Sequence, residues 1–188
     1  MPTNLGKIDG IDVLVMTRAE CGLPAPAPMQ KRPVHLFGTT VHHTATPDPE
    51  LDPVQRWLSI FHEATGTGLA EHYTDIPYND GVARLEAGVG VILGGRPHDV
   101  IGAHARPIDP VLAAHNIANL YTLGVALVGT NPTPESNAAL HAYLYLANVG
   151  EHAPLVMPHS VWDPTECCGD KQRGWLLELK NPNVILHR

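Results

Sequence analysis

The chain alternates short apolar, β-branched runs with longer amphipathic segments, and this alternation constrains its fold more than any other feature. The runs that predict strands are residues 12–16, 34–42, 73–82, 89–93, 123–129 and 154–157. The segments that predict helices are residues 52–65, 133–150 and about 170–180. Strands that alternate with helices favour an α/β layer architecture. We therefore expect a mixed central β-sheet flanked by helices, with the strongly apolar run 123–129 at its centre.

The helix predicted at 52–65 has start signals and an apolar face in its sequence. Asp52 can cap its first turn, where the following proline is tolerated because that position needs no N–H donor. Four apolar side chains share one face at helical spacing, namely Val54, Trp57, Leu58 and Phe61. The next predicted helix has Thr133 as its candidate cap and Gly150 at its end.

The composition bounds the size and the partners of the protein. A chain of 188 residues suffices for one domain with a full core, and we expect a single domain over residues 1–188. The net charge is −7 with histidine neutral, and no Lys/Arg run is present, so nucleic acid is excluded as an expected partner. No stretch approaches the ~20 apolar residues of a membrane span, so we expect no membrane partner.

The cysteines and the N-terminal segment predict where the chain is made. An odd number of cysteines, Cys21, Cys167 and Cys168, with one adjacent pair is not a disulfide framework. This favours synthesis in a reducing cytosol. Residues 1–20 lack a charged start followed by a long apolar core, so we expect no signal peptide.

Histidine and cysteine residues at two distant places form a candidate metal site. The segment "HSVWDPTECCGD" holds His159 and Cys167, and the segment "FGTTVHHTAT" ends its apolar run in the doublet His42-His43. Two imidazoles and one thiolate are a three-ligand zinc set, which leaves one coordination position open for water. Neighbours on a strand point to opposite faces, so only one residue of the doublet should be a ligand, and the spacing leaves open which. The alternative interpretation is buried histidines bonded to the backbone and cysteines packed as small hydrophobic residues.

Six segments, in this order, resemble a known family, and together they span about residues 17–180. They are "TRAECGLPAP" (17–26), "TVHHTAT" (40–46), "DIPYNDGV" (75–82), "VGVILGGRPHDVIGAHA" (89–105), "NLYTLGVALVG" (119–129) and "HSVWDPTECCGD" (159–170). The chain resembles the zinc-dependent N-acetylmuramoyl-L-alanine amidases that share a fold with peptidoglycan recognition proteins and amidase-type phage endolysins. The resemblance implies that fold for this chain.

The resemblance also implies a ligand set and two catalytic groups. His42, His159 and Cys167 would hold one catalytic Zn²⁺. Tyr78 falls where the family has a tyrosine beside the reactive water, so it would orient that water or relay its proton. Thr165 falls where members have Lys or Thr near the scissile carbonyl, and it would donate a hydrogen bond to the oxyanion.

Further residues have weaker implied roles. His43 would pack beside the site or orient a ligand, and His104 would line the substrate groove unless it makes a structural hydrogen bond. Arg96 would contact substrate or pair inside the fold. Glu71 and Glu86 are alternative general bases if Tyr78 is misplaced.

The sequence departs from the family pattern at several positions. Gly94 stands where an acidic residue is common, His98 where Trp is common, and Cys168 where Pro is frequent. Extra residues, "ARLEAG", follow the tyrosine segment and put the local alignment in doubt. These departures concern the substrate groove and not the metal ligands.

The implied function is hydrolysis of the amide bond between N-acetylmuramic acid and L-alanine in peptidoglycan. We expect a monomeric phage endolysin catalytic domain, made in the host cytoplasm and acting on the cell wall after release. The main alternative is a non-catalytic peptidoglycan-binding recognition module, although such modules commonly lack the ligand cysteine that this chain retains at Cys167. A third hypothesis is a cytosolic zinc hydrolase of soluble muropeptides, a class that usually has Asp at the last ligand position.

Overall fold

The computed structural model describes residues 1–32, 36–44, 52–66, 73–148 and 155–178. Its strands are β1 (Thr3–Ile8), β2 (Ile11–Met16), β3 (Gly38–His43), β4 (Asp80–Glu86), β5 (Val89–Gly94), β6 (Thr122–Leu127) and β7 (Leu155–Pro158). Its helices are α1 (Pro53–Thr65), α2 (Pro110–Ala114), α3 (Ile117–Tyr121), α4 (Pro134–Asn148), the 3₁₀ turn η1 (His159–Val161) and α5 (Asp170–Glu178).

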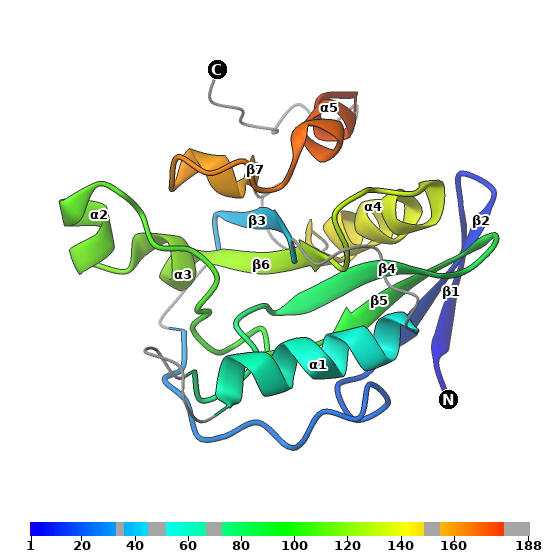
Figure 1. Ribbon diagram of the computed structural model, residues 1–188, viewed down its shortest axis with the longest axis horizontal. Helices are drawn as coiled ribbons and strands as arrows, with labels where there is room; N and C mark the ends of the chain where they lie inside the picture. Colours follow the sequence, from blue (N-terminus) through cyan, green and yellow to red (C-terminus); the bar gives the residue numbers. More distant parts are fainter. Residues whose placement is uncertain (33–35, 45–51, 67–72, 149–154, 179–188) are drawn as a thin grey trace.

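The described strands form one mixed sheet in the order β1-β2-β5-β4-β6-β3-β7 (Figure 1). The pairs β2–β5, β4–β6, β6–β3 and β3–β7 are parallel, whereas β1–β2 and β4–β5 are antiparallel. Every residue of β6 is buried, as expected for an inner strand with parallel neighbours and both faces covered. The predicted mixed sheet and the inner position of the run around 123–129 are confirmed.

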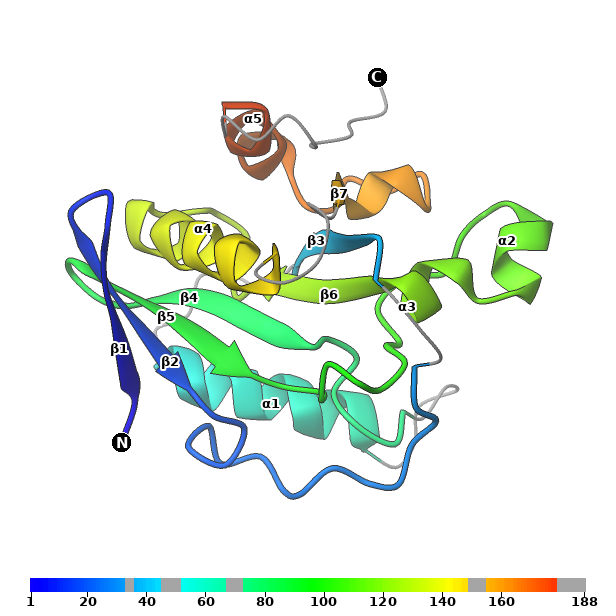
Figure 2. The same cartoon turned by 180° about the vertical axis from the view of Figure 1, so that it is seen from behind.

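Helices cover both faces of the sheet (Figures 1 and 2). Helix α4 packs on β1, β2, β4 and β5 from one side, and α1 packs on β4 from the other. Each face has its own apolar core: Val41, Val125 and Leu140 are central to the α4 side, and Trp57 and Leu93 to the α1 side. Side chains that alternate along a strand supply both cores.

The structure corrects the expected strand at 73–82. The segment stays irregular until Asp80, where β4 begins. Two buried polar side chains hold the irregular part: Asp75 accepts from Arg18 at 2.7 Å, and Asn79 Nδ2 donates to the carbonyls of Arg96 and Pro97. Because these bonds bind the segment to loops, it does not join a strand ladder.

Other boundaries differ by a few residues, and four elements were not predicted. Strand β3 begins at Gly38 and not at residue 34, and residues 33–35 lie outside the described part of the chain. Gly150 and residues 179–180 also lie outside it, so the predicted ends of α4 and α5 stay predictions. The elements that the sequence pattern did not reveal are β1, α2, α3 and η1. Strand β1 is almost wholly exposed, so it lacks the apolar alternation that indicates a strand.

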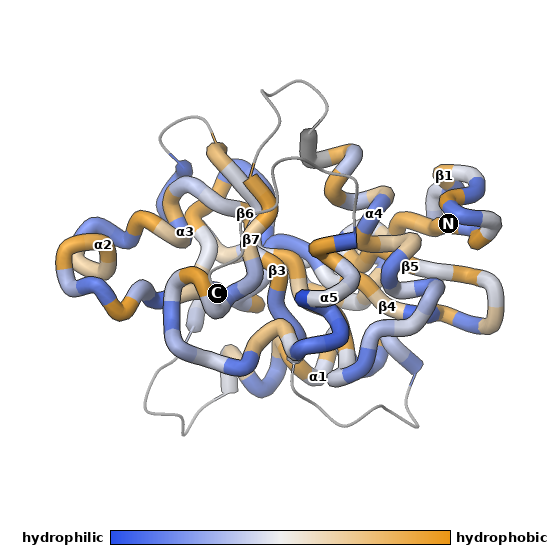
Figure 3. Tube along the Cα trace, turned by 90° about the horizontal axis from the view of Figure 1, so that it is seen from above, coloured by the Kyte–Doolittle hydropathy of each residue, from blue (hydrophilic) through white to orange (hydrophobic). Residues whose placement is uncertain are grey.

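The end of the molecule that carries α2 exposes apolar side chains. Helix α2 lies at the end opposite β1 (Figure 1). Hydrophobic residues are visible on α2 in the hydropathy view (Figure 3), and Ile108, Val111 and Leu112 of this region are exposed. Among the described residues, no helix combines the length and the apolar character that crossing a membrane would require.

The N-cap of α1 provides a first testable prediction. Asp52 accepts a hydrogen bond from the Val54 N–H at 2.7 Å, as the sequence predicts for a cap. We expect Asp52→Ala to lower the free energy of unfolding by about 1 kcal/mol, measured by urea denaturation, because one end donor of the helix loses its acceptor. Asp52→Asn is the matched control, since its amide oxygen can still accept, and an equal loss in both variants would contradict the cap.

Candidate metal centre

Side chains from two distant parts of the chain, β3 and the segment after β7, converge in one group, which we call the metal group. One nitrogen from each of His42 and His159 and the sulfur of Cys167 lie within 4.8 Å of one another. His42 comes from β3, His159 opens η1 directly after β7, and Cys167 ends the loop that leads to α5. Strands β3 and β7 are parallel neighbours, so both imidazoles leave the sheet close together.

The donor set and its spacing fit a zinc ion. In a tetrahedral zinc site with ordinary Zn–N and Zn–S bonds, the nitrogen and sulfur donors lie about 3.5 Å apart. Here His42 Nδ1 is 4.0 Å from Cys167 Sγ, so a small inward movement brings both to bonding distance. Mixed imidazole and thiolate donors favour zinc over magnesium or calcium, which prefer oxygen ligands.

The alternation of β3 separates the two members of the histidine doublet. His42 is 1% exposed and joins the metal group, whereas His43 is half-buried and approaches the thiol from another side. The His43 backbone N–H donates to Cys167 Sγ at 3.3 Å, and the His43 Nδ1 lies 3.1 Å from the same sulfur. The placement of His42 in the group and of His43 beside it agrees with the implied roles.

The interior position of the group determines its protonation. Burial lowers the pKa of His42 well below its usual value, with a further contribution from His104. Burial also lowers the pKa of His159, and it raises the pKa of the Cys167 thiol to about 11, a shift that the His43 N–H opposes. Neutral imidazoles have a free lone pair for a metal, whereas the thiol needs a nearby cation to ionise.

Tyr78 lies beside the metal group. Its ring centroid is 5.2 Å from that of His42, and its other neighbour is Trp57, which stacks on it at 6.2 Å. Burial raises the pKa of the Tyr78 phenol, and the nearby Cys167 adds to this shift. A buried phenol with a raised pKa stays protonated, which favours hydrogen-bond donation over action as a base.

Thr165 lies two residues before Cys167, in the loop that leads to α5. Its hydroxyl accepts the Cys167 N–H at 3.3 Å, and its own N–H donates to the Asp163 carbonyl at 2.7 Å. These bonds fix the backbone that presents the cysteine. The predicted donation to an oxyanion stays a prediction.

Arg96 is used inside the fold. It is 6% exposed, and its guanidinium donates to the carbonyls of Ile76, Ile101 and Asp75 at 2.9, 2.8 and 3.3 Å. Its donors therefore bind the segment at 75–76 and the loop at Ile101, which argues against the contact with substrate predicted for it.

The structure places one of the two alternative general bases, Glu86. Glu86 is exposed at the end of β4, five residues beyond Gly81, which shares a row of the sheet with Ala126 and His42. That separation is about 17 Å along the strand, too far for proton transfer at the metal group. Glu71 lies outside the described residues.

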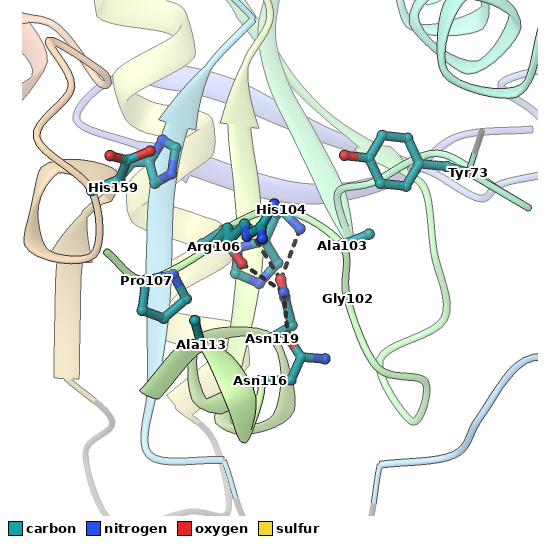
Figure 4. Close-up of a pocket in the computed structure, with 12 residues that line it drawn as sticks. Tyr73, Gly102, Ala103, His104, Arg106, Pro107, Ala113, Asn116, Asn119 and His159 are labelled. Carbon is teal, nitrogen blue, oxygen red and sulfur yellow. Dashed lines mark hydrogen bonds between the residues drawn. The ribbon is translucent and has the colours of Figure 1, made fainter. Parts of the chain in front are cut away.

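A polar pocket of about 450 Å³ adjoins the metal group (Figure 4). His104 and His159 line it, and Tyr73 lies across the pocket from His159. The predicted contact of His104 with substrate stays a prediction. Further lining residues that sequence reasoning missed include Arg106, Asn116, Asn119 and Asp163. Three of these four lie in or beside the unpredicted helices α2 and α3 or the loop before them, so no periodic pattern marked them.

Comparisons with known proteins were made by sequence and by structure. Neither a scan of protein-family models nor a search of curated protein sequences found a match. Solved structures do match. The complex of peptidoglycan recognition proteins LCa and LCx with tracheal cytotoxin matches with a TM-score of 0.72 and 19% identity, over 91% of this chain and 98% of that one.

Two further structures agree. Wild-type Drosophila PGRP-LB matches with a TM-score of 0.69 and 21% identity, over 92% of this chain and 96% of that one. Human PGRP-IBETAC in complex with glycosamyl muramyl pentapeptide matches with a TM-score of 0.71 and 18% identity, over 95% of this chain and all of that one. The protein therefore has the fold of the peptidoglycan recognition proteins and their amidase-like relatives, as the resemblance of its sequence segments implied.

Proposed function

We propose that this protein is a zinc amidase that hydrolyses the bond between N-acetylmuramic acid and L-alanine in peptidoglycan. The observation that carries the proposal is the buried group of His42, His159 and Cys167 beside a polar pocket. When bound there, zinc would lower the pKa of a water from its high bulk value toward ~7 and polarise the scissile carbonyl. A closed structural site would need a fourth protein ligand, and within the described residues the group holds three.

The surrounding residues would prepare this group for its ligand. The His43 N–H donates to the Cys167 sulfur and would stabilise its thiolate form. His159 lines the pocket while also belonging to the metal group, so a carbonyl bound in the pocket would lie next to the residues that would hold the zinc. The protein's part is thus to hold two neutral imidazoles and one thiolate on a rigid sheet edge.

The pocket suits a muramyl peptide in size and character. Its volume of about 450 Å³ is in the usual range for small-ligand sites. Its lining combines the phenol of Tyr73, the guanidinium of Arg106 and the amide of Asn116, which can bond to peptide groups and carboxylates. Two of the similar structures are complexes with tracheal cytotoxin and with glycosamyl muramyl pentapeptide, and we extend that ligand class to this chain.

Tyr78 would donate a hydrogen bond to the reacting oxygen. Removing the hydroxyl by Tyr78→Phe should lower kcat by about 10²–10³-fold, because one donor to the developing oxyanion is lost. Zinc content should stay at the wild-type level, since the ring keeps its packing on Trp57 and His42. The assay is peptide release from walls together with metal analysis of the same sample. A wild-type kcat in the variant would rule out this role.

The alternative is a peptidoglycan-binding module without catalysis, because two of the similar structures are recognition proteins in complex with tracheal cytotoxin and with glycosamyl muramyl pentapeptide. The retained Cys167 favours the enzyme. The deciding experiment incubates the zinc-loaded protein with purified cell walls and measures new alanine α-amino groups, with a chelator-treated sample as control. Release that depends on zinc supports the amidase, and wall binding without release supports the module.

We also propose that the reaction serves host lysis by a phage, with a monomeric enzyme that is made in the host cytoplasm and reaches the wall after its release. The support is the likeness of the sequence segments to amidase-type endolysins. Light scattering would measure the monomer, and added protein should clear suspensions of bacteria whose outer barrier has been removed. If the protein releases peptide from walls but the suspensions stay turbid, the amidase proposal stands and the lytic role is rejected.

A further inference from the structure

We propose that His104 is a positioning residue that fixes the tautomer and ring orientation of His42, so that His42 presents Nδ1 to the metal. The inference rests on the proposed metal centre. His104 is buried beneath His42, with ring centroids 5.1 Å apart in an edge-on arrangement. The His42 Nε2 lies 3.1 Å from the His104 Nδ1, and the His104 Nε2 lies 3.3 Å from the Thr122 carbonyl oxygen.

The direction of these hydrogen bonds follows from their last member. A carbonyl oxygen only accepts, so the His104 Nε2 must hold a proton and donate it to Thr122. A neutral imidazole protonated at Nε2 has a free lone pair at Nδ1, which must then accept from the His42 Nε2–H. His42 therefore has its proton on Nε2 and its lone pair on Nδ1, the atom that faces Cys167 Sγ at 4.0 Å.

A fitted slot holds His104 in place. The Asn119 Oδ1 accepts the backbone N–H groups of His104 and Ala105 at 2.8 and 3.1 Å, and these bonds are visible beneath His104 in Figure 4. The ring lies against Gly124 of β6 and Gly102, where a Cβ on either glycine would overlap it. Glycine at these positions thus allows the imidazole to lie flush with the sheet under His42.

A second chain of hydrogen bonds passes through the side chain of the same residue, Thr122. Trp162 Nε1 donates to Thr40 Oγ1 at 2.9 Å, and Thr122 Oγ1 donates to the Ala118 carbonyl at 2.7 Å. Because the Thr122 proton is already used, the 2.9 Å bond between the two hydroxyls runs from Thr40 to Thr122. Trp162 lies in the loop between the ligands His159 and Cys167. Thr122 is therefore linked to this loop through its hydroxyl, by way of Thr40, and to His104 beneath His42 through its carbonyl oxygen.

The tautomer can be measured without metal or activity. Nitrogen-15 NMR of the histidine rings in the metal-free wild-type protein distinguishes protonated from unprotonated ring nitrogens. We expect the protons of His42 and His104 on Nε2 in both rings. A His42 ring protonated at Nδ1 would overturn the proposal.

Two substitutions of His104 separate positioning from packing. His104→Ala removes the acceptor, and we expect zinc affinity, measured by chelator competition, to fall by about 10–100-fold with a mixture of His42 tautomers. His104→Asn places an amide oxygen near the Nδ1 position, so it should recover most of the affinity. His141→Ala, on α4 at the opposite face of the sheet, should bind zinc as the wild type does. Wild-type affinity in His104→Ala, or an equal loss in both His104 variants, would overturn the proposal.

The outcomes also separate this inference from the proposed function. If the wild type binds zinc and the tautomers are as expected, but walls release no peptide, the amidase proposal fails and the positioning role of His104 stands. If walls are cleaved but His104→Ala binds zinc as the wild type does, the positioning role of His104 fails and the amidase proposal stands. Should His104→Ala fail to fold, the NMR measurement on the wild type still decides.

Discussion

Cys167→Ser should abolish tight zinc binding and lower amidase activity by at least about 10³-fold. Serine has nearly the same shape, but its hydroxyl does not ionise near neutral pH, so the site loses its one anionic ligand. Without the metal, the pKa of the attacking water stays at its high bulk value and is not lowered toward ~7, which makes the estimate of 10³ conservative. The thiol is 8% exposed and accepts the His43 N–H, and among the described residues Cys167 is the one cysteine of the metal group.

The experiment measures zinc per chain by elemental analysis and peptide release from walls on the same preparation. Cys21→Ala is the matched control, because Cys21 is also buried but lies in the α1-side core outside the metal group. His42→Ala should behave as Cys167→Ser does. Full zinc and full activity in both ligand variants would refute the metal centre and the amidase together.

Trp57→Ala should lower the free energy of unfolding by about 3–5 kcal/mol, the usual range for deleting a large buried aromatic side chain. Trp57 is fully buried, and its ring fills the space that a Cβ on Gly81 or Gly95 would enter. Its Nε1 donates to the Gly94 carbonyl at 3.1 Å, so the alanine variant leaves both a cavity and a carbonyl without its donor. The same ring supports Tyr78, so peptide release should fall as well.

Urea denaturation followed by circular dichroism gives the change, with an unchanged m-value as the sign that two-state unfolding persists. Trp57→Phe keeps most of the apolar ring and loses the hydrogen bond, so its loss should be clearly smaller. Tyr145→Ala, on the exposed part of α4, should change stability by less than about 0.5 kcal/mol. A Trp57→Ala variant as stable as Tyr145→Ala would show that α1 does not depend on this residue.

The layers of the fold were predictable because buried positions recur in a regular pattern along the sequence of a strand or helix. Strand β6 is apolar on both faces, and α1 repeats its apolar residues at helical spacing, so both were found. Exposed β1 has no such pattern, and the segment before Asp80 has strand-like residues, but the side chains of Asp75 and Asn79 bind it to loops instead. Tertiary hydrogen bonds of this kind are invisible to local patterns.

The metal group was predictable in residue type and not in geometry. The doublet on β3 left the ligand undecided on spacing alone, and the family resemblance pointed to His42, which the structure places in the group. The interior role of Arg96 depends on three carbonyls, two at residues 75–76 and one at Ile101, and the support of His42 by His104 depends on a glycine in β6. Such contacts become visible only once distant segments are placed side by side.

The separation of 125 positions in sequence between His42 and Cys167 has a consequence for biosynthesis. During translation His42 emerges first, and His159 and Cys167 follow only after β4, β5 and β6 have been made. Strand β7, which delivers His159, must also align against β3 before the donors meet. The three donors can therefore hold an ion together only once β7 and the loop after it have emerged, and a product that ends before β7 would keep His42 of this group alone.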